Sequence, residues 1–377
     1  MSALEEVLAL VEREGPITFD RYMDVALYGV SGFFATGGGA GRRADFITSP
    51  EVGPLFGAVV ARAFDAEWER LSRPDPFVVV EVGAGRGALA RSVLDARPNC
   101  APALRYLCVE RSPVLRDAVA ELVPLEPPAN VLAVGPSDDE ADGPVEPGAG
   151  PLVAVLDDLP AVSLTGVVLA NELLDNLPVA LLERTEDGWA EVRVGADHRG
   201  ELVEVLVGAS SQSGALAGEL APAAPPGARI PLQRAATAWL RQVLSSLDRG
   251  RLIALDYADT TASMATRPCD EWLRTYRAHA RGGPPLARPG SQDITCEVAV
   301  DQLVRAHRPR SEASQADWLR AHGIDDLVAA ARATWHERAA IGDLAALRAR
   351  SAVGEAEALT DPAGLGAFRV LEWQVGQ

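Results

Sequence analysis

Three glycines at alternate positions behind an acid are the residues of this sequence that point most directly to chemistry. Glu81, Gly83, Gly85 and Gly87 stand in the stretch VVVEVGAGRGA, residues 78–88. Glycines permit positive φ and close approach of the backbone to a ligand, and the first N–H groups of a following helix are free to bind one. The spacing therefore predicts a strand, a turn and a helix that together hold a nucleoside.

Two cofactors fit this stretch. Gly83, Gly85 and Ala88 match the dinucleotide pattern G-x-G-x-x-G/A, which would imply hydride transfer to or from NAD. An acid followed by three alternate glycines suits S-adenosylmethionine (SAM), the donor in methyl transfer. Glu81 favours SAM, because a carboxylate before the turn can bond loop amides and face the cationic methionine end. The motif also begins about 80 residues into the chain, which is typical of methyltransferases.

Other acids follow later predicted strands. Glu110 ends the predicted strand 104–110, where a carboxylate accepts from both ribose hydroxyls. Asp158 lies before the fourth predicted strand and could accept from the adenine amino group while Leu159 packs on the ring. An ordinary acidic turn explains Asp158 equally well.

The stretch ANELLDNLPV places Asn171, Glu172 and Asp175 at the end of the fourth predicted strand. In an open α/β sheet this end faces the ligand crevice, so these three residues are the candidate catalytic residues beside the methyl acceptor. A carboxylate can orient a guanidinium bidentately and take up or disperse its charge as the nitrogen attacks. For Asp175, a helix N-cap is the alternative interpretation.

The elements that must position these residues alternate between strands and helices from residue 77 onward, which is typical of a parallel sheet. We predict seven strands, at 77–82, 104–110, 130–134, 165–172, 251–257, 294–300 and 367–375. The expected fold class is α/β, with a Rossmann-like SAM-methyltransferase sheet of seven mostly parallel strands.

Domain organisation follows from the same pattern. Residues 1–75 are predicted to form an N-terminal helical extension and a cofactor-covering loop. Residues 76–377 should form the Rossmann-like methyltransferase domain. It carries insertions at about 185–230, including a hairpin, and at about 258–292, and a helical segment at about 301–352.

Composition excludes several classes of function. The chain has 377 residues and no lysine, so a P-loop lysine and Schiff-base chemistry are excluded. Its formal net charge of -18 disfavours nucleic acid and suits a basic protein partner, although solubility alone explains it as well. The four cysteines are scattered and the five histidines form no zinc-binding pair, so we expect no metal. The N-terminus shows neither a signal peptide nor a membrane span, and a cytoplasmic location is expected.

Six stretches together resemble the MidA-type methyltransferases, the family of the mitochondrial complex I assembly-factor arginine methyltransferase. They occur in family order and span nearly the whole chain: GPITFDRYMDVALY, DFITSPEVGPLFG, VEVGAGRGALARSVL, LANELLDNLPV, LRTYRAHARGGPPLARPGSQDIT and LGAFRVLEW. The resemblance implies SAM as methyl donor and a protein arginine as acceptor, with a subunit of respiratory complex I as a candidate.

The resemblance also implies roles for individual residues. It places a loop beside the cofactor, made by Thr48, Ser49, Pro50 and Glu51. It places Gly83, Gly85 and Gly87 under the methionine part and Glu110 on the ribose, with Asn171, Glu172 and Asp175 on the acceptor side. A late motif then covers the active site, made by Tyr276, His279, Pro289, Gly290, Gln292, Asp293 and Thr295. Tyr276, His279 and Asp293 are its candidate substrate-binding residues.

The chain departs from the family pattern at several positions. Phe33 and Phe34 stand where tyrosines are common, Ala44 replaces a glycine, and Glu297 stands where histidine is frequent. ALDYA, residues 254–258, lacks a glycine after its tyrosine. Because these positions lie in loops expected to meet the acceptor, a small natural product remains an alternative acceptor. A non-catalytic SAM-binding assembly factor also remains open, as does the oligomeric state, a homodimer included.

Overall fold

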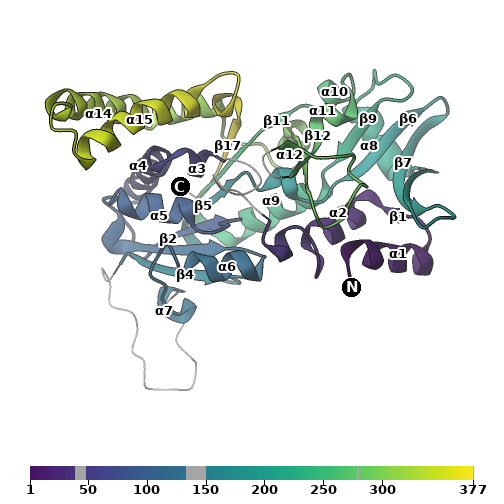
Figure 1. Cartoon of the computed structure of the whole chain (residues 1–377), viewed down its shortest axis with the longest axis horizontal. Helices are drawn as coiled ribbons and strands as arrows, with labels where there is room; N and C mark the ends of the chain where they lie inside the picture. The colour runs from purple at the N-terminus through teal and green to yellow at the C-terminus, as the bar shows by residue number, and fades with distance from the viewer. Residues whose placement is uncertain (39–47, 133–149, 278–279, 377) are drawn as a thin grey trace. The chain divides into compact units, whose positions relative to one another are not determined.

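The computed structural model describes residues 1–38, 48–132, 150–277 and 280–376 (Figure 1). The chain divides into two compact units. The seven-stranded unit comprises residues 47–171, 243–255 and 309–377, and the five-stranded unit comprises residues 1–46, 172–242 and 256–308. The expected domain boundary at residue 75 stays a prediction.

A single sheet organises the seven-stranded unit. Its strand order is β16-β17-β10-β5-β2-β3-β4. The strands are β2 (Phe77–Val82), β3 (Leu104–Val109), β4 (Leu152–Leu156), β5 (Leu164–Asn171), β10 (Leu247–Asp256), β16 (Ser311–Ser314) and β17 (Arg369–Val375). Strands β4, β3, β2, β5 and β10 pair in parallel, whereas β16 and β17 pair antiparallel. The expected α/β fold with a mostly parallel sheet of seven strands is confirmed.

Two of the seven predicted strands are not part of this sheet. Residues 128–132 form helix α7 (Pro128–Leu132), and the third strand is β4 instead. Periodicity cannot separate a short apolar run in a helix from one in a strand, and a proline favours a helix start. Residues 294–300 supply β14 (Asp293–Cys296) and β15 (Val298–Ala299) of smaller sheets, and the sixth strand is β16. The polar sequence of β16, SEAS, carries no apolar pattern that would reveal it.

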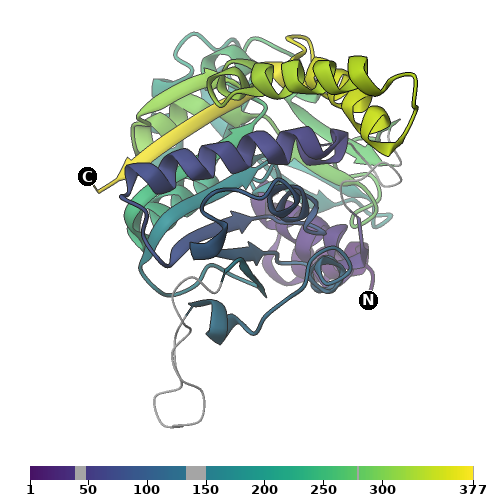
Figure 2. The same cartoon turned by 90° about the vertical axis from the view of Figure 1, so that its left-hand side faces the viewer.

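Helices α4 (Pro54–Arg70) and α5 (Ala88–Asp95) lie against this sheet, and Figure 2 shows α4 running along one face of it. The helix α6 (Pro113–Val119) follows β3.

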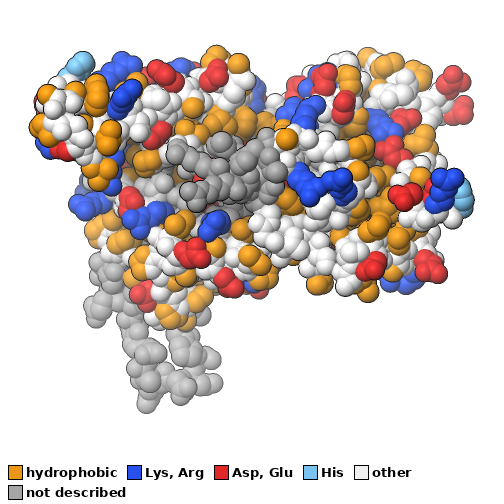
Figure 3. Space-filling view, viewed as in Figure 1, with side chains coloured by type: hydrophobic (Ala, Val, Ile, Leu, Met, Phe, Trp, Pro, Cys, Tyr) orange, Lys and Arg blue, Asp and Glu red, His pale blue; other side chains and the backbone are white. Residues whose placement is uncertain are grey.

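At the C-terminal side, α13 (Gln315–Ala321) leads into the helical hairpin of α14 (Ile324–Arg338) and α15 (Leu344–Thr360). Hydrophobic and arginine side chains intermingle on the surface of that hairpin (Figure 3), where Ile341, Leu344 and Leu347 are exposed.

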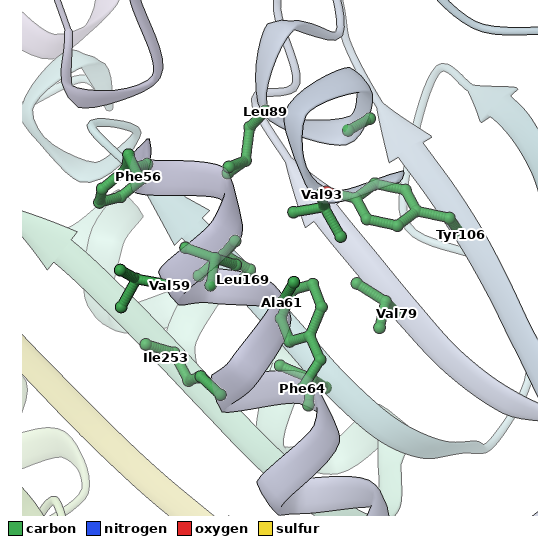
Figure 4. Packing of buried hydrophobic residues seen from close by; sticks show 14 of the residues in the cluster. Phe56, Val59, Ala61, Phe64, Val79, Leu89, Val93, Tyr106, Leu169 and Ile253 are labelled. Carbon is green, nitrogen blue, oxygen red and sulfur yellow. The ribbon is translucent and has the colours of Figure 1, made fainter. Parts of the chain in front are cut away.

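The core between α4, α5 and the sheet fixes the strand that leads to the glycines. Phe56 and Phe64 of α4 pack with Val79 of β2, Tyr106 of β3 and Leu169 of β5 (Figure 4). All five side chains are fully buried. Burying an aromatic side chain of this size stabilises a fold by roughly 1.5–3 kcal/mol, so this cluster holds β2 rigidly in the sheet.

The five-stranded unit contains an antiparallel sheet in which β1-β7-β6-β9 follow one another and β8 pairs with β7. These strands are β1 (Ile17–Thr18), β6 (Ala180–Thr185), β7 (Gly188–Ala196), β8 (Leu202–Gly208) and β9 (Arg229–Leu232). The expected hairpin is therefore present, as β7 and β8. Helix α1 (Ala3–Glu14) opens with a capping box between Ser2 and Glu5, and α2 (Phe19–Tyr28) follows.

Smaller elements complete this unit. A short sheet pairs β12 (Leu273–Arg277) with β13 (Ala280–Arg281) and β14, and β11 (Ala258–Asp259) pairs with β15. The helices are α8 (Ser211–Leu220), α10 (Thr261–Met264), α11 (Cys269–Trp272) and α12 (Val300–Ala306), with the short turn η3 (Leu174–Asn176). Helix α9 (Arg234–Ser246) carries the chain from the five-stranded to the seven-stranded unit.

Candidate functional site

The glycine stretch forms the predicted strand, turn and helix in the seven-stranded unit. Gly83, Gly85 and Gly87 all have left-handed φ, at +75°, +55° and +81°. The amide of Gly83 donates to the carbonyl of Val109 at the end of the neighbouring strand, over 2.9 Å. Gly87 precedes α5, and a Cβ atom on it would lie 2.9 Å from Val119. The three glycines are therefore required by the backbone path itself.

Gly85 is the glycine that leaves room for a ligand. A Cβ atom built on it would meet nothing within 4 Å, although its φ is one that other residues rarely adopt. A cradle of this kind fits SAM, since the backbone there can be approached closely.

Glu110 lies immediately after β3 and braces the same loop. Its carboxylate accepts from the amide of Gly85 over 2.9 Å and from the amide of Ser112 over 2.8 Å. Burial raises the pKa of Glu110, and the bonds from Ser112 and Gly85 oppose that rise. The structure thus brings Glu110 to the glycine loop, as required for a ribose contact.

Glu81 is held beneath the loop and not on its surface. Its side chain is 5% exposed and accepts a 2.6 Å bond from the hydroxyl of Tyr106. Burial raises its pKa to about 7, while the bonds from Tyr106 and the amide of Ala90 act to lower it. Glu81 therefore ties β2 to the first turn of α5, and the expected contact with the methionine end stays a prediction.

Asp158 and Leu159 follow β4 at the same carboxyl edge of the sheet. Asp158 is exposed and accepts from the amide of Leu159 over 2.7 Å, while Leu159 is half-buried. The turn is thus available to a ligand, but no described side chain fixes the orientation of Asp158.

Residues 48–50 begin helix α3 (Ser49–Val52) of the seven-stranded unit. Thr48 and Ser49 are buried, and Pro50 is half-buried. The hydroxyl of Ser49 donates to Gln315 over 3.0 Å, and Gln315 donates to the carbonyl of Leu359 over 3.1 Å. Ser49 therefore anchors this loop to α13 and α15, and its expected contact with the cofactor stays a prediction.

The acidic stretch turns sharply where β5 ends. Asn171 closes β5 and is half-buried, and Glu172 follows it as the first residue of a segment of the five-stranded unit. Glu172 has a φ of +52°, which is uncommon for a residue other than glycine. Backbone strain of this kind is often found at functional sites, so Glu172 remains a candidate catalytic residue.

Asp175 lies within η3 and is 5% exposed. It is not a helix N-cap, because Leu173 takes that position without a side-chain bond. The hydroxyl of Tyr257 donates to its carboxylate over 2.9 Å. Burial raises the pKa of Asp175 to about 6, against the lowering effect of Tyr257, nearby amides and the charge of Arg274.

Asp256, which closes β10, shapes the same turn. It is 3% exposed and accepts from the amides of Leu174 and Asp175 over 2.9 and 3.2 Å. Burial raises the pKa of Asp256 far above its usual range, with the charges of Asp175 and Glu172 adding to the rise. Three carboxylates of the five-stranded unit thus interact at one place, where an added cation would be stabilised.

The late motif reaches this turn through Asp293. Its carboxylate accepts from the side-chain amide of Asn176 over 2.9 Å, and it is 1% exposed. Tyr276 is half-buried on β12 and lies opposite Asp293 in register. His279 and Ala44 lie outside the described residues.

Two departures from the family pattern have clear local partners. Phe34 stacks on Tyr28 with centroids 5.5 Å apart, and Tyr28 donates to the carbonyl of Asn176 over 3.1 Å. Phe33 meets Phe34 edge-on and is 4% exposed. The two phenylalanine rings are therefore linked to the turn at 174–176 through Tyr28.

Asp256 and Tyr257 are the site residues that sequence reasoning missed. Their signal was present, because both stand at the carboxyl end of a predicted parallel strand, the position that identified Glu110 and Asn171. Asn176 was also missed, and its partner Asp293 is remote in sequence, so no local pattern marks the pair.

Across the residues that the structure describes, no group of His, Cys, Asp or Glu is arranged to hold a metal ion. Within the same residues, no helix is both long and apolar enough to cross a membrane.

Comparison with known proteins identifies relatives over most of the chain. The model of a family of S-adenosyl-L-methionine-dependent methyltransferases matches residues 59–317. A Burkholderia thailandensis protein solved with S-adenosyl-homocysteine bound has a TM-score of 0.79 and 27% identity, covering 99% of this chain and 91% of its own. S-adenosyl-homocysteine is the product that SAM leaves after methyl transfer, so its presence in that relative supports SAM as the cofactor.

Two curated relatives carry an activity in their names. The Drosophila melanogaster protein arginine methyltransferase NDUFAF7 homolog, mitochondrial, is 28% identical over 81% of this chain and 69% of its own. The rat protein arginine methyltransferase NDUFAF7, mitochondrial, is 31% identical over 52% of this chain and 45% of its own. This chain thus aligns with about half the length of the rat protein.

These names also correct one expectation. A cytoplasmic location was expected from the scattered cysteines and the N-terminal residues, whereas the relatives are named as mitochondrial proteins. Cysteine spacing reports on redox conditions and cannot separate one reducing compartment from another.

Proposed function

The chain belongs to the family of S-adenosyl-L-methionine-dependent methyltransferases, and from this premise we propose that it methylates an arginine side chain of a protein. The observation that carries this acceptor is the turn at residues 172–176, where Asp175 and Asp256 are buried beside Glu172. Carboxylates brought together in this way repel one another, and a bound cation reduces that repulsion. A guanidinium group suits them because its N–H groups match the geometry of a carboxylate. The names of the fly and rat relatives support the same acceptor.

On the donor side, Gly83, Gly85 and Gly87 would hold SAM against the backbone, and Glu110 would accept from its ribose hydroxyls. When bound, SAM supplies a methyl group on a sulfonium, which a nucleophile can displace in line. The protein contributes mainly by positioning, because a well-aligned displacement needs little further assistance.

On the acceptor side, Asp175 and Glu172 would bind the guanidinium and fix its orientation. A new N–C bond forms as the C–S bond breaks, and the sulfur keeps the electron pair. The nitrogen then carries an excess proton, which passes to a carboxylate or to water. A carboxylate with a pKa of about 6 is mostly ionised near neutral pH, so Asp175 can bind the cation and accept that proton transiently.

The decisive experiment incubates the protein with SAM labelled in its methyl group and with a protein acceptor. A subunit of respiratory complex I, named by the family resemblance, is the first acceptor to assay. We expect label on arginine, and we expect it to be lost in Glu172→Gln. The control Glu183→Gln should retain it; this variant changes a glutamate of β6 that pairs with Arg229 of β9.

The other outcomes distinguish the alternatives. Label found in a small-molecule fraction with none in protein would replace the proposed acceptor by a natural product. Binding of SAM without transfer of label to any acceptor would favour an assembly factor that keeps SAM as a structural ligand.

A further inference from the structure

Glu297 lies at the centre of a network of arginines in the five-stranded unit. Its side chain is 10% exposed and forms ion pairs with Arg267, over 2.6 Å, and with Arg274. Arg267 also pairs with Asp259 over 2.9 Å. A buried carboxylate that binds two guanidinium groups fixes the position of both.

Arg274 connects this network to the candidate acceptor site. Its guanidinium carbon lies 5.4 Å from the ring centroid of Tyr257. The hydroxyl of that ring donates to Asp175 over 2.9 Å. A cation beside the ring favours donation by the hydroxyl, so Arg274 supports Asp175 through Tyr257.

Arg274 is also a competitor for Asp175, because it carries the same group as the proposed acceptor. Its positive charge opposes the rise in the pKa of Asp175 that burial causes. Once released from Glu297, this guanidinium would be free to pair with the Asp175 carboxylate. The acceptor would then meet an occupied site.

Resting on the proposed function, we propose that Glu297 is a positioning residue that holds Arg274 on Tyr257 and off Asp175. The Asp175 carboxylate is thereby kept for the incoming guanidinium. This gives the departure from histidine at position 297 a physical role, since a neutral histidine could not pair with two arginines.

The first test measures binding of the peptide acetyl-glycyl-arginyl-glycine amide to the full chain saturated with S-adenosyl-homocysteine, by calorimetry at pH 8. Glu297→Gln should weaken binding about fivefold, because Arg274 moves onto Asp175. Adding Arg274→Leu should restore it by removing the competitor. The control Glu183→Gln, which disturbs another arginine ion pair of the same unit, should leave binding within about twofold.

The second test does not depend on any acceptor. Carbon NMR of the carboxyl groups reports the pKa of Asp175, whose charged and titratable surroundings are Tyr257, Asp256, Arg274 and Cys296. In Glu297→Gln a direct ion pair with Arg274 should lower that pKa, whereas Arg274→Leu should raise it. An unchanged or raised pKa in Glu297→Gln overturns the proposal, as does unchanged peptide binding.

Failure of the proposed function would be recognised separately. A wild-type protein that binds S-adenosyl-homocysteine but no arginine peptide would remove the arginine acceptor. The response of the Asp175 pKa to Glu297→Gln would still decide whether Glu297 restrains Arg274. If that variant does not fold, Arg274→Leu alone decides, and an Asp175 pKa that it leaves unmoved overturns the proposal.

Discussion

Both carboxylate oxygens of Glu110, the proposed ribose ligand, are bonded to backbone amides. One accepts from Gly85 and the other from Ser112. Glu110→Gln would place an NH2 group against one of these donors and remove the negative charge that we propose binds the ribose hydroxyls. We expect SAM affinity to fall at least about tenfold, or about 1.4 kcal/mol. Calorimetry checks this, with exposed Glu121→Gln as control, and an unchanged affinity would contradict the assigned role.

Glu81 makes stability depend on pH. Its pKa rises from 4.5 to about 7 on folding, so between these values the folded chain binds more proton than the unfolded chain. Its contribution is therefore fully present below about pH 4.5 and is lost as pH rises through about 7, by roughly 3 kcal/mol. Glu81→Gln should flatten this fall while keeping an acceptor for Tyr106. Urea unfolding at pH 5 and pH 8 measures it, and equal pH slopes in the two proteins would refute it.

At the scale of elements, substitution of Gly85 in the loop between β2 and α5 can distinguish the cost of backbone strain from the loss of a ligand contact. Gly85 and Gly200 both have left-handed φ, +55° and +79°, and an added Cβ meets nothing within 4 Å at either. Alanine at either position should therefore cost a similar 1–2 kcal/mol, roughly the usual penalty for left-handed backbone. Only Gly85→Ala should also weaken SAM binding, because only its Cβ enters the cradle. Thermal unfolding and calorimetry on both variants test this, and equal affinities would exclude close approach at Gly85.

For the whole molecule, the net charge of -18 bears on the choice of acceptor. An acidic protein attracts basic partners over distances that salt screens, with a Debye length of about 10 Å at 0.1 M salt. We expect the KM for a basic protein acceptor to rise severalfold between about 0.05 and 0.5 M salt. The affinity for SAM should change little, because its site is local and partly buried. A KM that is insensitive to salt would instead point to an uncharged small acceptor.

Local sequence pattern decided some of the helices and strands, and tertiary pairing decided others. The apolar run of β2 and the glycines after it predicted a strand, a turn and a helix, because those residue types restrict the backbone locally. The third and sixth strands were misplaced for the opposite reason. Residues 130–134 are apolar but helical in part, and β16 is a strand although it is polar, since pairing with β17 decides its state.

By itself, the sequence determined the fold class, the methyl donor and the acidic character of the turn at residues 172–176. Each depends on residue types at fixed local spacing, as in Glu81 to Gly87 or Asn171 to Asp175. Only the tertiary structure decided which partners those residues have. It placed Tyr106 on Glu81, and Asp256 and Tyr257 on the turn at Asp175. These partners are remote along the chain, and burial and hydrogen bonding depend on contacts that no local spacing encodes.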